Sequence, residues 1–172
     1  MQAIREIKTI NTDTILLSVP KSFMQAGKNC MSETNVFLDT NILIYLFDTR
    51  DLAKHNATKK LIADLQKTST LYISLQVVNE FSSAIISKIS KPMSLDKLGS
   101  YYDLFDDIFR IVPLTMDNSR NAIRIKAQYG LSFWDSLIIA SALDAGCKVL
   151  YSEDMQDGQV IEKKLTIKNP LT

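Results

Sequence analysis

The sequence predicts an α/β fold built from strand-helix units around a mostly parallel sheet. From Asn35 onward, short apolar runs of strand length alternate with longer segments in which apolar residues recur at helical spacing. The chain has 172 residues, 46% of them hydrophobic, which suffices to bury one sizeable core. Residues 1–30 show a different pattern. We therefore expect one α/β domain over residues 31–172, preceded by a short N-terminal extension over residues 1–30.

The first half of the domain is predicted to contain two strands, each followed by a helix. The apolar run at residues 36–38 is typical of a buried strand, and residues 70–74 have the composition of a second strand. Pro92 must end the helix after the second strand, because proline cannot continue a helix. In order, we expect a strand at 36–38, helices at 42–47 and 54–67, a strand at 70–74 and a helix at 75–91.

Capping residues delimit the predicted helices of the second half. Ser94 and Ser132 suit the N-cap position, because a serine hydroxyl can accept a hydrogen bond from a free backbone amide of the first turn. Gly130 and Gly146 suit the left-handed conformation that commonly ends a helix. We interpret Asp117 as a further N-cap, with a further outer acid of a functional site as its alternative. In order, we expect a helix at 94–110, a strand at 111–114, helices at 117–129 and 133–145, and strands at 148–151 and 165–167.

Composition excludes several classes of function. Cys30 and Cys147 lie far apart, and His55 is the single histidine, so neither a zinc site nor a Cys-His nucleophile is indicated. The 20 basic and 19 acidic side chains give no basic excess of the kind that marks many nucleic-acid binders. No apolar stretch approaches the roughly 20 residues that span a bilayer, and residues 1–8 lack a signal-peptide core. We therefore expect a cytoplasmic protein that does not act at a membrane.

Acidic residues fall at the carboxyl ends of the predicted strands. Asp39 directly follows the first strand, and Glu153 and Asp154 follow the strand at 148–151 in the same way. Glu80 lies in the second turn of the helix after its strand, and Asp135 lies in the first turn of its helix. Because sites of parallel α/β sheets form beyond the carboxyl ends of the strands, we expect Asp39, Glu80, Asp135 and Asp154 to converge there.

Such a cluster favours metal-assisted phosphoryl chemistry. Magnesium and manganese prefer oxygen ligands, and one or two carboxylates usually hold magnesium together with water and phosphate. The ion polarises a phosphoryl group and makes water a better nucleophile. Unpaired acids packed together repel one another, so a cation gives the simplest reason for the cluster.

Each acid also has a purely structural interpretation. Asp135 stands three residues after Ser132, as in a capping box, and its charge suits a helix N-terminus. Glu80 can be a solvated helix residue, Asp39 a turn residue, and Asp154 part of a polar loop. The joint arrangement of the four favours the functional interpretation.

Residues next to these acids are predicted to cap a helix, to support the site or to lie in the core. We expect Asn41 to cap the helix that begins near residue 42, with oxygen contact to the site as its alternative. Thr40 is a candidate supporting residue. Trp134 is expected in the core, together with Phe133, Leu137 and Ile138.

Four segments together resemble the successive motifs of PIN-domain ribonucleases, most closely the VapC-type toxins of bacterial toxin-antitoxin modules. They are VFLDTNILIY at 36–45, VNE at 78–80, LSFWDSLI at 131–138 and LYSEDM at 150–155. The resemblance covers about residues 35–170, and the order and spacing of the motifs make it specific. It implies a PIN-like three-layer α/β/α architecture around the parallel sheet.

The resemblance also implies an activity. It indicates a toxin-like endoribonuclease that hydrolyses RNA with Mg²⁺ or Mn²⁺. The family's metal-binding acids fall on Asp39, Glu80, Asp135 and Asp154, while Glu153 or Asp157 could share or replace the role of Asp154. It further implies a homodimer and a cognate antitoxin whose tail covers the active site.

Residues 1–28 lie outside the nuclease motifs. The segments IREIK at 4–8 and LSVPK at 17–21 weakly resemble the start of small antitoxins. The extension at 1–30 is therefore interpreted as antitoxin-derived. The alternatives are translation of an overlapping frame before Met31, a segment added by cloning, and a loosely docked tail.

Two other functions remain open from the sequence. The chain could be a catalytically silent PIN-like module that acts through an antitoxin or operator DNA. An aspartate-nucleophile phosphatase is disfavoured, because Asn41 stands where such an enzyme has its second aspartate, two residues after Asp39.

Overall fold

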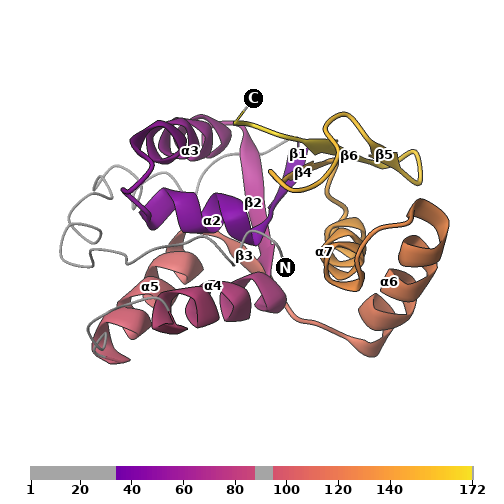
Figure 1. The fold of residues 1–172 in the computed structure, drawn as a ribbon, viewed down its shortest axis with the longest axis horizontal. Helices are drawn as coiled ribbons and strands as arrows, with labels where there is room; N and C mark the ends of the chain where they lie inside the picture. Colours follow the sequence, from indigo (N-terminus) through magenta and orange to yellow (C-terminus); the bar gives the residue numbers. More distant parts are fainter. Residues whose placement is uncertain (1–33, 88–94, 172) are drawn as a thin grey trace.

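The structure of the protein is a computed structural model that describes residues 34–87 and 95–171 (Figure 1). The strands are β1 (Thr34–Leu38), β2 (Ser69–Ser74), β3 (Arg110–Val112), β4 (Val149–Tyr151), β5 (Val160–Ile161) and β6 (Leu165–Lys168). The helices are α2 (Thr40–Phe47), α3 (Leu52–Leu65), α4 (Leu75–Ser87), α5 (Leu95–Ile108), α6 (Met116–Tyr129) and α7 (Phe133–Asp144). The extension at 1–30 lies outside the described residues.

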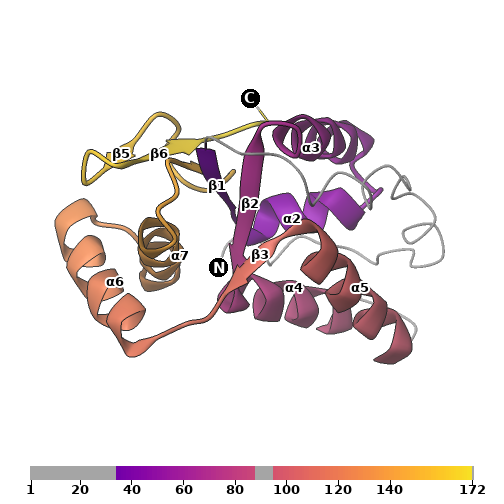
Figure 2. The same cartoon turned by 180° about the vertical axis from the view of Figure 1, so that it is seen from behind.

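The strands form one six-stranded sheet in the order β3-β2-β1-β4-β6-β5. All neighbouring pairs are parallel except β5 and β6. Helices α2 to α5 lie on one side of the sheet and α6 and α7 on the other (Figures 1 and 2). The predicted α/β class and the three-layer architecture are therefore confirmed.

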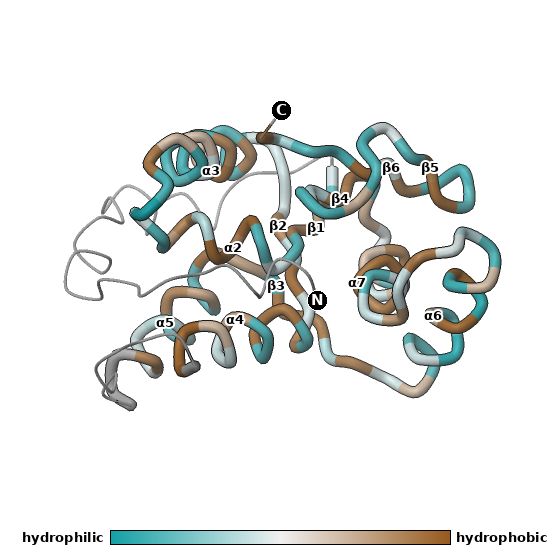
Figure 3. Tube along the Cα trace, viewed as in Figure 1, coloured by the Kyte–Doolittle hydropathy of each residue, from teal (hydrophilic) through white to brown (hydrophobic). Residues whose placement is uncertain are grey.

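The central elements are buried because their sequences are almost continuously apolar. Val36, Phe37 and Leu38 of β1 are at most 2% exposed, as is typical of a parallel strand covered on both faces. Helix α7 is buried at every position from Ser136 to Ala142, because it lies between the sheet and α6. Hydrophilic residues are frequent on α3 and α6, at the two outer edges of the molecule in Figure 3.

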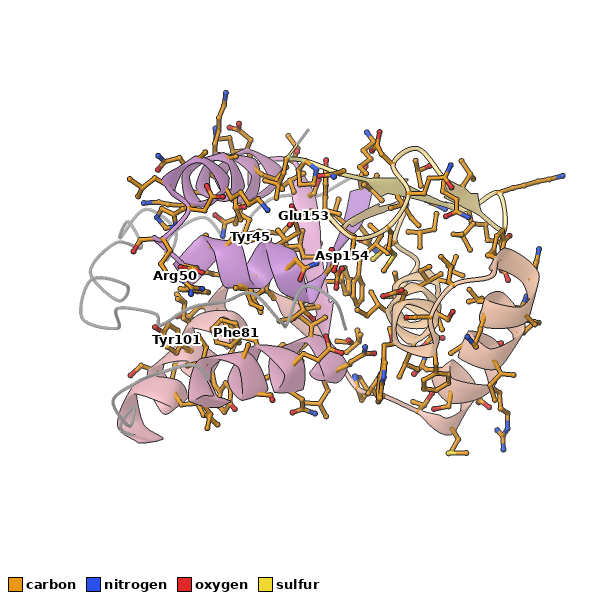
Figure 4. The ribbon with its side chains drawn as sticks, in the orientation of Figure 1. Tyr45, Arg50, Phe81, Tyr101, Glu153 and Asp154 are labelled. Carbon is orange, nitrogen blue, oxygen red and sulfur yellow. The ribbon has the colours of Figure 1, made fainter. Side chains whose placement is uncertain are left out.

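An aromatic cluster joins α2, α4 and α5 on one side of the sheet. The rings of Phe47, Phe81, Tyr101 and Phe105 are all essentially unexposed, and neighbouring ring centroids lie 5.0 to 6.0 Å apart. Most of these contacts are edge to face, the arrangement that aromatic quadrupoles favour. Figure 4 labels Phe81 and Tyr101 in this cluster. The cluster fixes α2 and α4, whose first two turns carry candidate site residues.

The structure differs from the predicted elements in a few places. Strand β5 was not predicted, since it has only two residues, and its hairpin turns through Glu162 and Lys163 at positive φ, where no glycine or asparagine marks a turn. The N-cap of α6 is Thr115, so the interpretation of Asp117 as N-cap is wrong; Asp117 lies in the first turn and pairs with Arg120. The predicted helix end before Pro92 lies outside the described residues.

The other boundaries agree to within a few residues. Helix α7 begins after the predicted cap Ser132, whose hydroxyl accepts a hydrogen bond from the Asp135 amide. Gly130 ends α6 with φ of 70°, the left-handed conformation expected there. Within residues 34–87 and 95–171, no helix combines the length and the apolar character needed to cross a bilayer.

Candidate active site

A cavity of about 410 Å³ opens at the carboxyl edge of the sheet, and all four predicted acids line it. Asp39 follows β1 and Asp154 follows β4, while Glu80 lies on α4, the helix after β2. Asp135 comes from the first turn of α7 on the other side of the sheet. The structure therefore brings Asp39, Glu80, Asp135 and Asp154 together from four separate segments.

Asp39 is the most constrained of the four acids. It is the N-cap of α2, and its Oδ1 accepts a hydrogen bond of 2.6 Å from the Thr40 amide. Its Oδ2 accepts a second hydrogen bond of 2.6 Å from the hydroxyl of Ser152, which is fully buried at the end of β4. Ser152 was not predicted as a site residue, because only the parallel pairing of β1 with β4 brings it to Asp39.

The pKa of Asp39 is raised from 3.8 to about 7. Burial of the carboxyl group is the main cause; the hydrogen bonds from Ser152 and Thr40 oppose it, and the charges of Glu80 and Asp135 add to it. Burial and neighbouring acids both disfavour an anion. A positive charge in this cavity would therefore stabilise the ionised form of Asp39.

Glu80 is held by two side chains. The Thr40 hydroxyl donates a hydrogen bond of 2.6 Å to Oε2, and the amide of Gln76, one turn earlier on α4, donates one of 2.9 Å to Oε1. Gln76 also donates to the backbone oxygen of Trp134 at 3.3 Å. The expected contact of Thr40 is thus with Glu80, whereas Gln76 was missed, although its i, i+4 spacing to Glu80 was a usable signal.

Asp154 and Glu153 point to different surroundings (Figure 4). Asp154 lines the cavity and accepts a hydrogen bond of 2.8 Å from the amide of Asn41. The carboxylate of Glu153 accepts hydrogen bonds from the Tyr45 hydroxyl and from the Lys54 ammonium, and does not line the cavity. Of these two neighbours, the geometry favours Asp154 as the site residue.

Asn41 and Asp157 make contacts other than those predicted for them. Asn41 does not cap α2, since Asp39 occupies that position; it is buried and bonded to Asp154. Its interpretation as the cap is therefore wrong. Asp157, the further candidate, is exposed, accepts a hydrogen bond from the Asn169 amide and is absent from the cavity lining.

Asp135 makes only half of the capping box that its spacing predicts. Its amide donates to the Ser132 hydroxyl at 3.0 Å, but among the described residues its carboxylate makes no return bond to the Ser132 amide. The carboxylate is thus left to line the cavity.

The remaining lining residues are either apolar or polar and uncharged. Trp134, predicted as core, is wrongly assigned: it is 47% exposed and forms part of this lining. The other apolar lining residues are Ile44, Leu114 and Ile138. The uncharged polar residues are Thr40, Asn41, Gln76, Asn79 and Ser83.

The donor set fits a hard divalent cation. All candidate ligand atoms in the cavity are oxygens of carboxylates, amides and hydroxyls, the type that magnesium and manganese prefer. The Oε1 atom of Gln76 is buried and has no hydrogen-bond partner in the part of the chain that is described. Within that same part, no three acidic, histidine or cysteine side chains are close enough to form a complete metal-binding group. An ion here would need water or substrate oxygens to complete its shell.

Comparisons with known proteins concern the family and the fold of the chain. A family model described as PIN domain matches residues 36–157. A comparison with curated protein sequences gave no significant match. Among solved structures, a toxin-antitoxin complex from Klebsiella pneumoniae is similar with a TM-score of 0.60 at 20% identity, covering 78% of this chain and 97% of that one.

Two further solved structures are similar. VapBC2 from Rickettsia felis, bound to a DNA fragment from its promoter, has a TM-score of 0.55 at 20% identity, covering 78% of this chain and 98% of that one. VapC20 from Mycobacterium tuberculosis, described as a Sarcin-Ricin loop cleaving toxin, has a TM-score of 0.55 at 19% identity, covering 67% and 86%. At these identities the likenesses show the shared fold.

Proposed function

The chain belongs to the PIN domain family, and on that premise we propose that it is a toxin-like endoribonuclease that hydrolyses RNA phosphodiester bonds with divalent metal ions. One observation carries the proposal: four acids from separate segments line one cavity, where burial, with a smaller contribution from the charges of Glu80 and Asp135, raises the pKa of Asp39 to about 7. The similarity in fold to a toxin described as cleaving the Sarcin-Ricin loop supports RNA as the substrate.

Asp39, Glu80, Asp135 and Asp154 would hold one or two ions of Mg²⁺ or Mn²⁺. When bound, such an ion supplies a positive charge that meets the phosphate and activates water for attack. We assign these four acids as the catalytic and metal-binding residues.

Three neighbouring side chains orient the acids. Ser152 donates to Asp39, Thr40 to Glu80 and Asn41 to Asp154, so one oxygen of each of these carboxylates is already engaged. Each bond restricts the rotation of its carboxylate. The second oxygen of Asp39 and that of Glu80 also accept hydrogen bonds, from the Thr40 amide and from Gln76. At neutral pH, Asp39 also retains a proton for part of the time, which a bound cation would displace.

The partners follow from the same proposal. The solved toxin-antitoxin complexes of similar fold support a cognate antitoxin that binds this chain. We keep a homodimer and a cytoplasmic site of action as parts of the proposal. The origin of the extension at 1–30 also remains a proposal: it is antitoxin-derived, or it is one of the three alternatives given above.

Cleavage of RNA by purified full-length protein tests the function. With Mg²⁺, the wild type should cleave single-stranded RNA. Asp39→Asn should cleave it more slowly by on the order of 100-fold or more, because substitution of a residue that only supports a metal ligand already lowers activity by about 10- to 100-fold. Asp106→Asn, which changes an exposed acid of α5, is the matched control and should match the wild type. Equal rates for wild type and Asp39→Asn would refute the assignment.

The alternative is a catalytically silent PIN-like module that acts through an antitoxin or operator DNA. The absence of a three-ligand group within residues 34–87 and 95–171 is the observation that favours it. Calorimetric titration with Mn²⁺ separates the two. The nuclease should bind Mn²⁺, and Asp39→Asn should weaken that binding; a silent module should show no binding that depends on the carboxylates.

A further inference from the structure

A single tryptophan stands at the cavity, beside the acids. Trp134 is the chain's only tryptophan, is 47% exposed and lines the same cavity as Asp39 and Asp154. We propose that Trp134 is a stacking platform for an unpaired nucleobase of the substrate. This inference rests on the proposed function and extends it to how the RNA is held.

The indole ring of Trp134 is more exposed than is usual for tryptophan. Tryptophan is usually largely buried because its indole has a large apolar area. Here the ring contacts Phe133, with centroids 5.5 Å apart and planes at 73°, an edge-to-face arrangement. Such a contact holds the indole in place without occupying both of its faces.

The backbone of Trp134 is tied to the acidic side of the cavity. Its carbonyl oxygen accepts a hydrogen bond from Gln76, and the same amide group donates to Glu80. Asp135 follows Trp134 directly in the first turn of α7. The platform and the acids are therefore fixed relative to each other, so a phosphate at the acids would leave a neighbouring base close to the indole.

The chemistry of the lining separates the two parts of a nucleotide. The acids and amides in the lining suit a cation and a phosphate, whereas the apolar lining residues, Trp134, Leu114 and Ile138 among them, suit a base. Stacking on an aromatic ring tolerates every base, because each base has a π-face. Bases inside a duplex are already stacked on their neighbours, so the platform favours single-stranded or looped RNA.

Fluorescence measures the contact directly, because Trp134 provides all of the tryptophan emission. Full-length Asp39→Asn protein, chosen because its cleavage is slow, is titrated with a single-stranded RNA and with an abasic RNA of equal length. The RNA with bases should quench the emission to saturation, and the abasic RNA should leave it unchanged. Equal quenching by both, or by neither, would overturn the stacking platform.

Kinetics then separate stacking from simple apolar contact. Trp134→Ala and Trp134→Leu should raise KM for single-stranded RNA about tenfold or more, with kcat within about twofold, because stacking contributes to binding of ground state and transition state alike. Trp134→Phe should restore most of the affinity. Ile123→Ala, which removes a 62% exposed side chain on α6, is the matched control and should leave KM unchanged.

The outcomes keep the two proposals distinct. If the wild type cleaves RNA and Trp134→Ala does so with unchanged KM, the platform fails while the nuclease stands. If Trp134→Ala weakens only the binding of an antitoxin protein, the ring is a protein contact, and the platform is likewise refuted. If no metal-dependent cleavage occurs but bases quench the emission, the nuclease fails and the platform stands. Thermal unfolding of each variant verifies that the fold is intact.

Discussion

The side-chain amide of Asn41 donates a hydrogen bond of 2.8 Å to the carboxylate of Asp154, across 113 residues of sequence. This contact joins the first turn of α2 to the loop after β4. Asn41 lies two residues after Asp39, so the segment that carries one predicted metal-binding acid also orients another, Asp154.

Removal of this hydrogen bond should weaken metal binding. In Asn41→Ala, the Asp154 carboxylate can rotate, and we expect affinity for Mn²⁺ and the cleavage rate to fall by about 10- to 100-fold. Calorimetric titration and RNA cleavage measure the two effects. Asn121→Ala, at an exposed position of α6, is the control. An unaltered Mn²⁺ affinity in Asn41→Ala would show that Asp154 needs no such support.

The two adjacent acids after β4 should respond differently to neutralisation. Asp154→Asn should lower the cleavage rate at least tenfold, because its carboxylate lines the cavity. Glu153→Gln should retain the rate of the wild type, because its carboxylate is engaged by Tyr45 and Lys54. The loss of this partly exposed ion pair should cost about 1 kcal/mol or less of unfolding free energy. A larger loss of cleavage in Glu153→Gln would reverse the assignment.

The raised pKa of Asp39 predicts how the stability of the metal-free protein depends on pH. The carboxyl group ionises near 3.8 when the chain is unfolded but near 7 when it is folded. Below about pH 4 it is protonated in both states, whereas above that pH the unfolded chain releases a proton that the folded chain retains. The contribution of Asp39 to the free energy of unfolding therefore decreases as pH rises from about 4 to about 7 and then levels off.

Asp39→Asn removes this dependence. In excess chelator at pH 8, the variant should exceed the wild type in unfolding free energy by a few kcal/mol, at most about 4 from a shift of about three units. Near pH 4 the difference should be much smaller. Urea denaturation of both proteins at each pH measures it. If the difference does not grow with pH, the Asp39 carboxyl ionises normally in the folded protein.

Two neighbouring tyrosines of α5 should respond oppositely to loss of the hydroxyl. Tyr101 is fully buried, its hydroxyl has no partner among the described residues, and burial raises its pKa to about 12. Tyr101→Phe should therefore stabilise the protein by about 1 kcal/mol, because a desolvated and unpaired hydroxyl is removed. Chemical denaturation measures the change.

Tyr102→Phe is the matched comparison. The Tyr102 hydroxyl shares a hydrogen bond of 2.8 Å with Ser82, and its loss should cost up to about 1 kcal/mol. If Tyr101→Phe were as destabilising as Tyr102→Phe, the Tyr101 hydroxyl would have a partner in the folded protein.

Local signals in the sequence sufficed for much of the fold. The alternation of apolar runs predicted β1 to β4 and β6, and capping chemistry placed Ser132 and Gly130 at helix ends, because these features depend on neighbours within a few residues. Strand β5 escaped prediction, since its two residues carry no periodicity and it forms only by pairing with β6.

The fold class and the position of the four acids near the strand ends could be predicted from the sequence, because parallel strands bring their carboxyl ends to one edge whatever the details of packing. Which neighbours hold those acids depends on long-range contacts in the folded chain. Ser152 and Asn41 reach Asp39 and Asp154 through strand pairing and helix placement, across 113 residues of sequence in each case. Trp134, predicted in the core, is 47% exposed and lines the cavity. Contacts between residues far apart in the sequence depend on the position of whole elements, which no local pattern specifies.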